Sequence, residues 1–208
     1  MSLGPHVEQL VALGEGPRAQ GPPRGIPSTA LGEELTAMLN LMNGFSAFED
    51  ALIVRGGGDD LESVRSWNSP DGWRSHYGRL SEGLFFFAED LFGGQFALTS
   101  RAIVSFDPET GESEEVGNSL EGWASAILSD PDVRTGRPLA HAWRERFGPL
   151  ARSFRLVPKI PFVFGGDFSV DNLRAMEARE SMCARGGLAV RIADLPDGTQ
   201  IALGGSDD

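Results

Sequence analysis

Cysteine and histidine are scarce in this chain, which has one cysteine, Cys183, and three histidines among 208 residues. A single cysteine cannot form an internal disulfide, and this set cannot complete the usual structural zinc patterns. A chain of this length buries roughly 70% of the surface that its unfolded form exposes, so its core alone suffices for folding. We therefore expect a single domain in a reducing compartment, with no metal and no cofactor.

Positive charge and long apolar runs are also lacking. Lysine and arginine number 18 against 30 aspartates and glutamates, which gives a net charge of -12. That sign is opposite to the electrostatic footprint of nucleic-acid-binding proteins. No apolar run approaches the ~18 residues that would span a bilayer, and the first residues lack the regions of a secretory signal. The sequence predicts a soluble, cytoplasmic protein that binds neither nucleic acid nor membranes.

Catalytic motifs are absent as well. No Gly-x-Ser-x-Gly or His-Glu-x-x-His pattern occurs, and His6, His76 and His141 do not stand in a recognisable setting for a base. The glycine run 56–58 precedes two aspartates, which would repel a phosphate, and the Gly-Gly-Asp-Phe segment at 165–168 is typical of a turn. We expect no enzyme activity. A pocket of carboxylates with shifted pKa values would instead favour an enzyme of unrecognised type.

The first 25 residues contain a short apolar pattern, Val7, Leu10 and Val11, followed by a stretch rich in glycine and proline. This composition predicts a frayed helical turn and a flexible N-terminal segment over residues 1–25. The remaining residues, 26–208, are predicted to form one domain with a C-terminal extension from about residue 139.

Helical periodicity is clearest in two places. After a capping hydroxyl at position 28 or 29, an apolar stripe runs to the Asn-Gly pair at 43–44, where glycine favours a helix end. A second stripe follows a capping box formed by Asn118 and Glu121. The two stripes comprise Leu31, Leu35, Met38, Leu39 and Met42, and Leu120, Trp123, Ala124, Ile127 and Leu128. Both helices are predicted to pack on a sheet through these residues.

Strand-like runs at 52–55, 84–88, 95–98 and 102–106 are separated by turn signals, and the segment 107–112 predicts a hairpin to an extended run ending at Val116. Further along, the pattern predicts a helix over 139–147 with Trp143 facing the core, a strand over 160–164, helices over 169–184 and 188–195, and a strand over 199–203. Helices beside hairpin-connected strands are typical of an α+β fold with a mostly antiparallel or mixed sheet.

Two kinds of residue are candidates for binding a partner. Acidic turns, which lack EF-hand spacing, would attract and steer a basic protein. Aromatic residues in the polar stretch 66–79 are either satellite core or interface anchors. The candidate partner-binding residues are Trp67, Trp73, Tyr77 and Arg79 as anchors, and Asp59, Asp60, Asp107, Glu109 and Glu112 as the acidic groups.

An ordered series of motifs extends over residues 25–130. It consists of Gly25-Ile26-Pro27, the helix with Leu31, Leu35 and Leu39 before Asn43-Gly44, Trp67-Asn68, Trp73, Tyr77, the strand 84–88, Phe92-Gly93-Gly94-Gln95-Phe96, the hairpin 107–112, and Ser119-Leu120-Glu121-Gly122-Trp123. This series resembles the SMI1/KNR4 family, also called the SUKH superfamily. The stretch from residue 139 goes beyond the shorter members of that family.

The resemblance implies an SMI1/KNR4-like α+β fold with a non-enzymatic, protein-binding role. Many bacterial members are similar to immunity proteins that neutralise toxins, and fungal relatives are similar to signalling scaffolds. We expect an immunity protein against a basic, nuclease-type toxin, because an acidic inhibitor associates faster with a basic target. The alternative is a regulatory or scaffold protein of the same fold without a toxin partner.

Overall fold

The computed structural model describes residues 3–196 and residue 199. Six strands form one antiparallel sheet in the order in which they occur along the chain, and two more pair as a separate antiparallel ribbon. The sheet consists of β1 (Phe45–Ala47), β2 (Leu52–Val54), β3 (Phe85–Asp90), β4 (Gln95–Leu98), β5 (Ile103–Phe106) and β6 (Ser113–Gly117). The ribbon consists of β7 (Phe154–Pro158) and β8 (Leu173–Glu177). The predicted α+β class is confirmed.

Helices account for most of the other regular structure in the described residues. The α-helices there are α1 (Pro5–Ala12), α2 (Ala30–Leu41), α3 (Val64–Trp67), α4 (Leu120–Ser129), α5 (Pro131–Thr135), α6 (Arg137–Phe147) and α7 (Ala178–Ile192). Four short 3-10 helices are η1 (Trp73–His76), η2 (Gly78–Ser81), η3 (Phe162–Phe164) and η4 (Val170–Asn172). No helix in this part of the chain combines the length and apolar character needed to cross a membrane.

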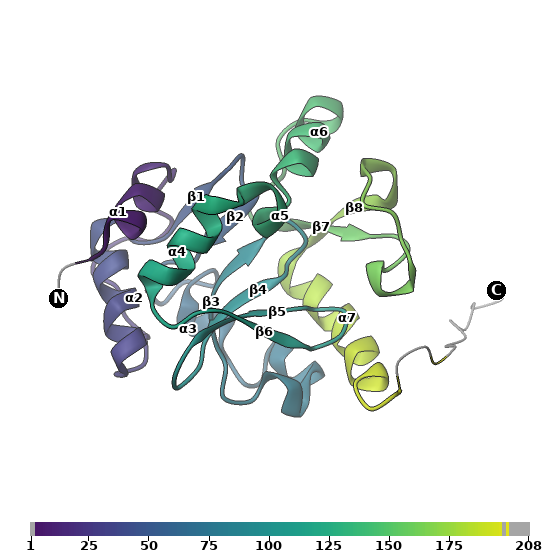
Figure 1. Ribbon diagram of the computed structural model, residues 1–208, viewed down its shortest axis with the longest axis horizontal. Helices are drawn as coiled ribbons and strands as arrows, with labels where there is room; N and C mark the ends of the chain where they lie inside the picture. The colour runs from purple at the N-terminus through teal and green to yellow at the C-terminus, as the bar shows by residue number, and fades with distance from the viewer. Residues whose placement is uncertain (1–2, 197–198, 200–208) are drawn as a thin grey trace.

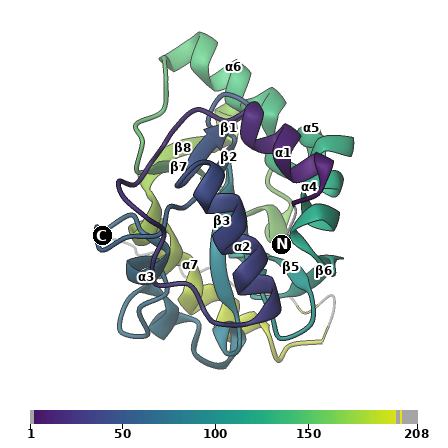
Figure 2. The same cartoon turned by 90° about the vertical axis from the view of Figure 1, so that its left-hand side faces the viewer.

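The six-stranded sheet lies between two helical layers (Figures 1 and 2). Helices α1, α2 and α4 cover one face, and α7 with η1 covers the other. On the first face, Trp123 of α4 contacts Phe87 and Phe96, with ring centroids 5.0 and 5.7 Å apart. Leu35 and Ile127, from the two predicted stripes, are fully buried in the same core. The predicted packing of both helices on the sheet is therefore confirmed.

The N-terminal helix α1 packs against this core. Val7 and Leu10 are fully buried, and the carboxylate of Glu121 on α4 accepts hydrogen bonds from the backbone N–H groups of His6 (3.0 Å) and Val7 (3.1 Å). After α1 the chain forms a bridge to β1. The frayed helical turn predicted there is instead the packed helix α1, because a carboxylate from α4 supplies the cap that the local sequence of α1 lacks.

The start of α4 also differs from the prediction. Its N-cap is Ser119, not Asn118, and the Ser119 hydroxyl accepts a hydrogen bond from the N–H of Gly122 at 3.1 Å. Glu34 of α2 accepts another from the N–H of Leu120 at 2.7 Å. The predicted capping box is wrong because the Glu121 carboxylate caps α1 instead, while Ser119 and Glu34 accept the first N–H groups of α4.

The first ribbon strand was predicted in the wrong place. The structure has β7 at Phe154–Pro158, whereas residues 160–164, predicted as a strand, contain η3. Arg155, the second residue of β7, is a buried charge, so it interrupts the apolar pattern by which a buried strand is identified.

Helix α7 replaces two predicted helices. The segment 169–184 begins as η4 and β8 and becomes helical only at Ala178, and α7 then continues through Gly186 and Gly187 to Ile192. A Cβ atom on Gly186 would lie 2.7 Å from the Cβ of His76, so glycine here permits close approach to η1. The predicted strand over 199–203 lies outside the described residues apart from position 199.

Candidate functional site

The three predicted aromatic anchors are core residues. Trp67, Trp73 and Tyr77 are each at most 1% exposed. The Trp73 ring lies 4.9 Å from Phe86 and 5.4 Å from Tyr77, and the Tyr77 hydroxyl donates a hydrogen bond to the carbonyl of Pro108 at 2.8 Å. The anchor prediction is wrong, because these rings cover the second face of the sheet together with α7.

The other predicted residues of the stretch 59–79 lie on the surface. Arg79 pairs with Asp194 at 2.6 Å, and Asp59 pairs with Arg65 at 3.1 Å. Asp60 accepts a hydrogen bond from the backbone of Glu62 at 2.9 Å. None of Asp59, Asp60 and Arg79 lines the groove that is described next.

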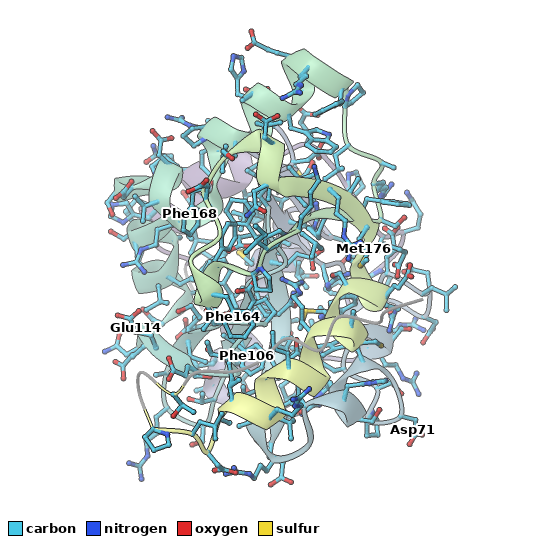
Figure 3. All side chains as sticks on the ribbon, turned by 90° about the vertical axis from the view of Figure 1, so that its right-hand side faces the viewer. Asp71, Phe106, Glu114, Phe164, Phe168 and Met176 are labelled. Carbon is cyan, nitrogen blue, oxygen red and sulfur yellow. The ribbon has the colours of Figure 1, made fainter. Side chains whose placement is uncertain are left out.

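Three predicted acidic residues do come together. Asp107, Glu109 and Glu112 of the β5–β6 hairpin line a groove of about 620 Å³, bounded also by the β3–β4 turn, α5 and the β7–β8 loop. Figure 3 shows Glu114 and Phe106 on the same side of the molecule as the loop with Phe168. The groove is lined by five carboxylates and two guanidinium groups, those of Asp90, Asp107, Glu109, Glu112 and Glu114, and of Arg134 and Arg185. Its charge is therefore predominantly negative.

Glu109 fastens the hairpin to the β7–β8 loop. Its side chain is only 4% exposed, and its Oε2 accepts a hydrogen bond from the N–H of Val163 at 2.9 Å. Its Oε1 is buried without a hydrogen-bond partner among the described residues. Burial raises the pKa of this carboxyl. Glu109 is thus a buried tether rather than the exposed steering charge predicted for it, whereas Asp107 and Glu112 are exposed.

The β7–β8 loop is closed by its own side chains. Asn172 accepts a hydrogen bond from the N–H of Ile160 at 2.9 Å and donates one to its carbonyl at 3.0 Å, as a paired strand would. A Cβ atom on Gly166 would lie 2.0 Å from the carbonyl oxygen of Ile160, so only glycine fits there. This closure fixes the part of the loop that faces the groove.

Aromatic side chains form the rim of the groove beside this loop. The rings of Phe162 and Phe168 stack in parallel at 4.0 Å, and Phe92 meets Phe162 edge-on at 5.4 Å. Phe168 is 68% exposed, and Val133, a groove residue on α5, is 78% exposed. Exposed apolar groups gathered at one site are typical of a binding surface. Because residues 165–168 were interpreted only as a turn, Phe168 was not predicted as a binding residue. A phenylalanine in a polar turn was the signal in the sequence that could have identified it.

Asp90 and Arg185 lie deeper in the groove. Asp90 Oδ1 accepts hydrogen bonds from the N–H groups of Phe92 (2.8 Å) and Gly94 (2.7 Å), which shapes the β3–β4 turn. Burial raises the pKa of Asp90 to about 7, although these two hydrogen bonds oppose the shift. Arg185 donates to the carbonyl of Phe92 at 2.7 Å. The turn is therefore held from both sides.

The groove thus contains two carboxyls with raised pKa values, Asp90 and Glu109. A shifted pKa is a signal of acid–base chemistry, but structural networks shift pKa values too. Each carboxyl accepts a backbone N–H that holds a turn or loop in place, which gives it a structural role. Within the described ranges, no three His, Cys, Asp or Glu side chains gather as metal ligands would. The excess of acidic side chains can attract a positively charged group.

Comparison with known proteins gives a distant structural likeness. A scan against models of protein families finds no match, and neither does a search of curated proteins. Among solved structures, the chain is similar to the crystal structure of Atu4351 from Agrobacterium tumefaciens, with a TM-score of 0.48 and 13% sequence identity. That likeness covers 78% of this chain and 76% of the other.

Proposed function

We propose that this protein is a non-enzymatic binding module whose groove holds a basic segment of a partner protein. The partner we propose is a cognate nuclease-type toxin, which the protein neutralises in the bacterial cytoplasm. The observation that supports this most directly is the groove itself, in which the exposed carboxylates of Asp107, Glu112 and Glu114 stand beside an exposed phenylalanine.

The charge of the groove suits a basic partner. The chain has a net charge of -12, and a groove with an excess of acidic groups focuses the resulting negative electrostatic potential. A nuclease must be positively charged where it holds nucleic acid, so an acidic surface placed there blocks that site and is also guided to it. The resemblance of residues 25–130 to a family with many immunity proteins points to the same class of partner.

The apolar rim suits a stable complex. A few central aromatic residues supply most of the binding energy of a specific interface, while charges around them mainly change the association rate. Phe168 and Val133 are exposed apolar residues that line the groove. A guanidinium or ammonium group of the partner would gain further from the face of an aromatic ring.

The first test is co-expression with the product of the neighbouring gene. We expect the neighbouring product alone to arrest growth and this protein to restore it, with a one-to-one complex on size-exclusion chromatography. Phe168→Ala is expected to speed dissociation of that complex, whereas Leu61→Ala, an exposed leucine outside the groove, is expected to leave it unchanged.

The outcomes separate the two functions. A neighbouring product that is not toxic, or that this protein does not neutralise, would contradict the immunity function. A non-toxic product that binds in the groove and is released faster by Phe168→Ala would favour the regulatory or scaffold protein instead. A complex that is insensitive to both substitutions would place the interface elsewhere.

A further inference from the structure

Arginine side chains gather at a second site, outside the groove. They come from the segment after α1, the end of β2, the approach to β7, β7 itself and the start of α7, and they are Arg18, Arg55, Arg152, Arg155 and Arg179. Arg18 donates to the carbonyl of Arg152 at 3.2 Å, and Arg152 donates to the carbonyl of Arg18 at 2.8 Å. Five like charges brought together from distant parts of the chain repel one another unless something compensates them.

The neighbouring carboxylates compensate only part of this charge. Glu89 lies 2.8 Å from both Arg55 and Arg155. Glu62 lies 3.3 Å from Arg18 and 3.2 Å from Arg152. Glu177 is the third carboxylate at the site, and it accepts a hydrogen bond from the N–H of Glu180. Three carboxylates against five guanidinium groups leave an excess of two positive charges, in a chain that is strongly acidic as a whole.

Arg55 is the least satisfied member of the cluster. Its side chain is 6% exposed and its guanidinium lies 3.4 Å above the centre of the Trp67 ring. Its Nη2 is close to Glu89 without the alignment of a hydrogen bond, and its Nε has no hydrogen-bond acceptor among the described residues. A buried donor without an acceptor is unfavourable, so an acceptor placed there would stabilise the protein.

The cluster encloses a small cavity. Four of the five arginines, all but Arg155, line it together with Trp67 and the three carboxylates, and its volume is about 20 Å³. The groups that line the cavity therefore have an excess of one positive charge. A cavity of this size holds about one water-sized atom. Arg152 and Glu62 are partly exposed, so the cavity adjoins the surface. We propose that this arginine cluster is a binding site for a small inorganic anion, which places a single acceptor atom among the guanidinium groups. An oxyanion such as phosphate would insert one oxygen and leave the others at the surface.

The test is a titration of the purified full-length protein with inorganic phosphate, sulfate and chloride at constant ionic strength. Isothermal calorimetry is expected to show saturable one-to-one binding, with a matching rise in melting temperature. Arg152→Gln removes one exposed charge of the cluster without opening the core, and it should weaken binding about tenfold. Arg146→Gln, which removes an exposed arginine paired with Asp171 elsewhere, is the control and should bind as the wild type does.

The three anions distinguish the shape of the site. Preference for phosphate and sulfate over chloride would show that the remaining oxygens also find donors, and equal binding of chloride would show that the single acceptor atom suffices. Stabilisation that follows ionic strength alone, or that is the same in Arg152→Gln and the wild type, would overturn the proposal. Neither result depends on the partner proposed for the groove, so the two proposals fail or stand separately.

Discussion

Glu89 is a buried carboxylate that forms ion pairs with two buried arginines, Arg55 and Arg155. Burial alone would raise the pKa of its carboxyl, but the attraction of Arg55 and Arg155 outweighs burial and holds the pKa at about 2. Glu89 therefore stays ionised while fully enclosed. It also explains the buried Arg155 in β7, since each arginine would be an uncompensated buried charge without this carboxylate.

Glu89→Gln should destabilise the protein by about 3–5 kcal/mol, because two buried guanidinium groups lose their counter-ion. Chemical denaturation with urea measures the change. Glu62→Gln, which breaks two partly exposed pairs, is the comparison and should cost no more than about 1 kcal/mol. Equal losses in the two variants would show that the Glu89 network contributes no more than a surface ion pair.

Asp90 should make stability depend on pH in the opposite sense to a salt-bridged carboxylate. Its pKa is raised from 3.8 to about 7 in the folded protein, so the folded state keeps this proton at pH values where the unfolded chain has lost it. The contribution of Asp90 to stability is therefore full below pH 3.8 and is lost as the pH rises towards 7. Asp90→Asn should become more stable relative to the wild type across this interval. Denaturation midpoints of both proteins at several pH values measure the difference, and a constant difference would contradict the assignment.

At the scale of elements, prediction succeeded where a local pattern alone decides the structure. Helix α4 and strands β2 to β6 follow apolar spacings and turn signals that need no distant partner. Strand β1 was missed because its turn to β2 passes through Phe48, Glu49 and Asp50, three residues with positive φ that give no glycine signal. Strand β7 and helix α7 were misplaced because two of their residues are determined by contacts distant in sequence. Arg155 pairs with Glu89, and Gly186 packs against His76.

Trp123 tests the packing of α4 on the sheet. It is fully buried between Phe87 and Phe96, so Trp123→Ala should cost about 3–5 kcal/mol. Thermal or urea denaturation measures the loss. A melting temperature close to that of the wild type would show that the site collapses around the smaller side chain.

Glu121 tests the attachment of α1. Glu121→Ala removes the acceptor for the N–H groups of His6 and Val7, and the loss should be about 1 kcal/mol, as for other N-terminal caps. Hydrogen exchange should accelerate in α1 and much less in the sheet, because the opening is local. Glu115→Ala, at an exposed position of β6, is the control. Unchanged exchange in α1 would show that Val7 and Leu10 alone hold the helix.

For the molecule as a whole, the β7–β8 ribbon connects the two proposed sites. Strand β7 carries Arg155 to the arginine cluster, and the loop that follows carries Phe168 to the groove. The sequence shows this region only as an extension beyond residue 139, with apolar signals too weak to place its strands. The hairpin carboxylates Asp107 and Glu112 were predictable because a turn is determined by the residues within it. The aromatic rim was not, because Phe162 and Phe168 reach the groove only through the packing of the β7–β8 ribbon against distant parts of the chain.

The distribution of charge leads to a kinetic prediction for the complex with the partner. Glu112→Gln with Glu114→Gln removes two charges from the groove, and Asp59→Asn with Asp60→Asn removes two from an exposed turn outside it. Both double variants change the net charge equally, so a general effect of charge would slow association equally. A groove that focuses the field should instead make the first pair slow association more and flatten its salt dependence more, with little change in the dissociation rate. Surface plasmon resonance at several salt concentrations measures both rates. Equal slowing by the two variants would mean that the whole acidic surface, and not the groove, guides the partner.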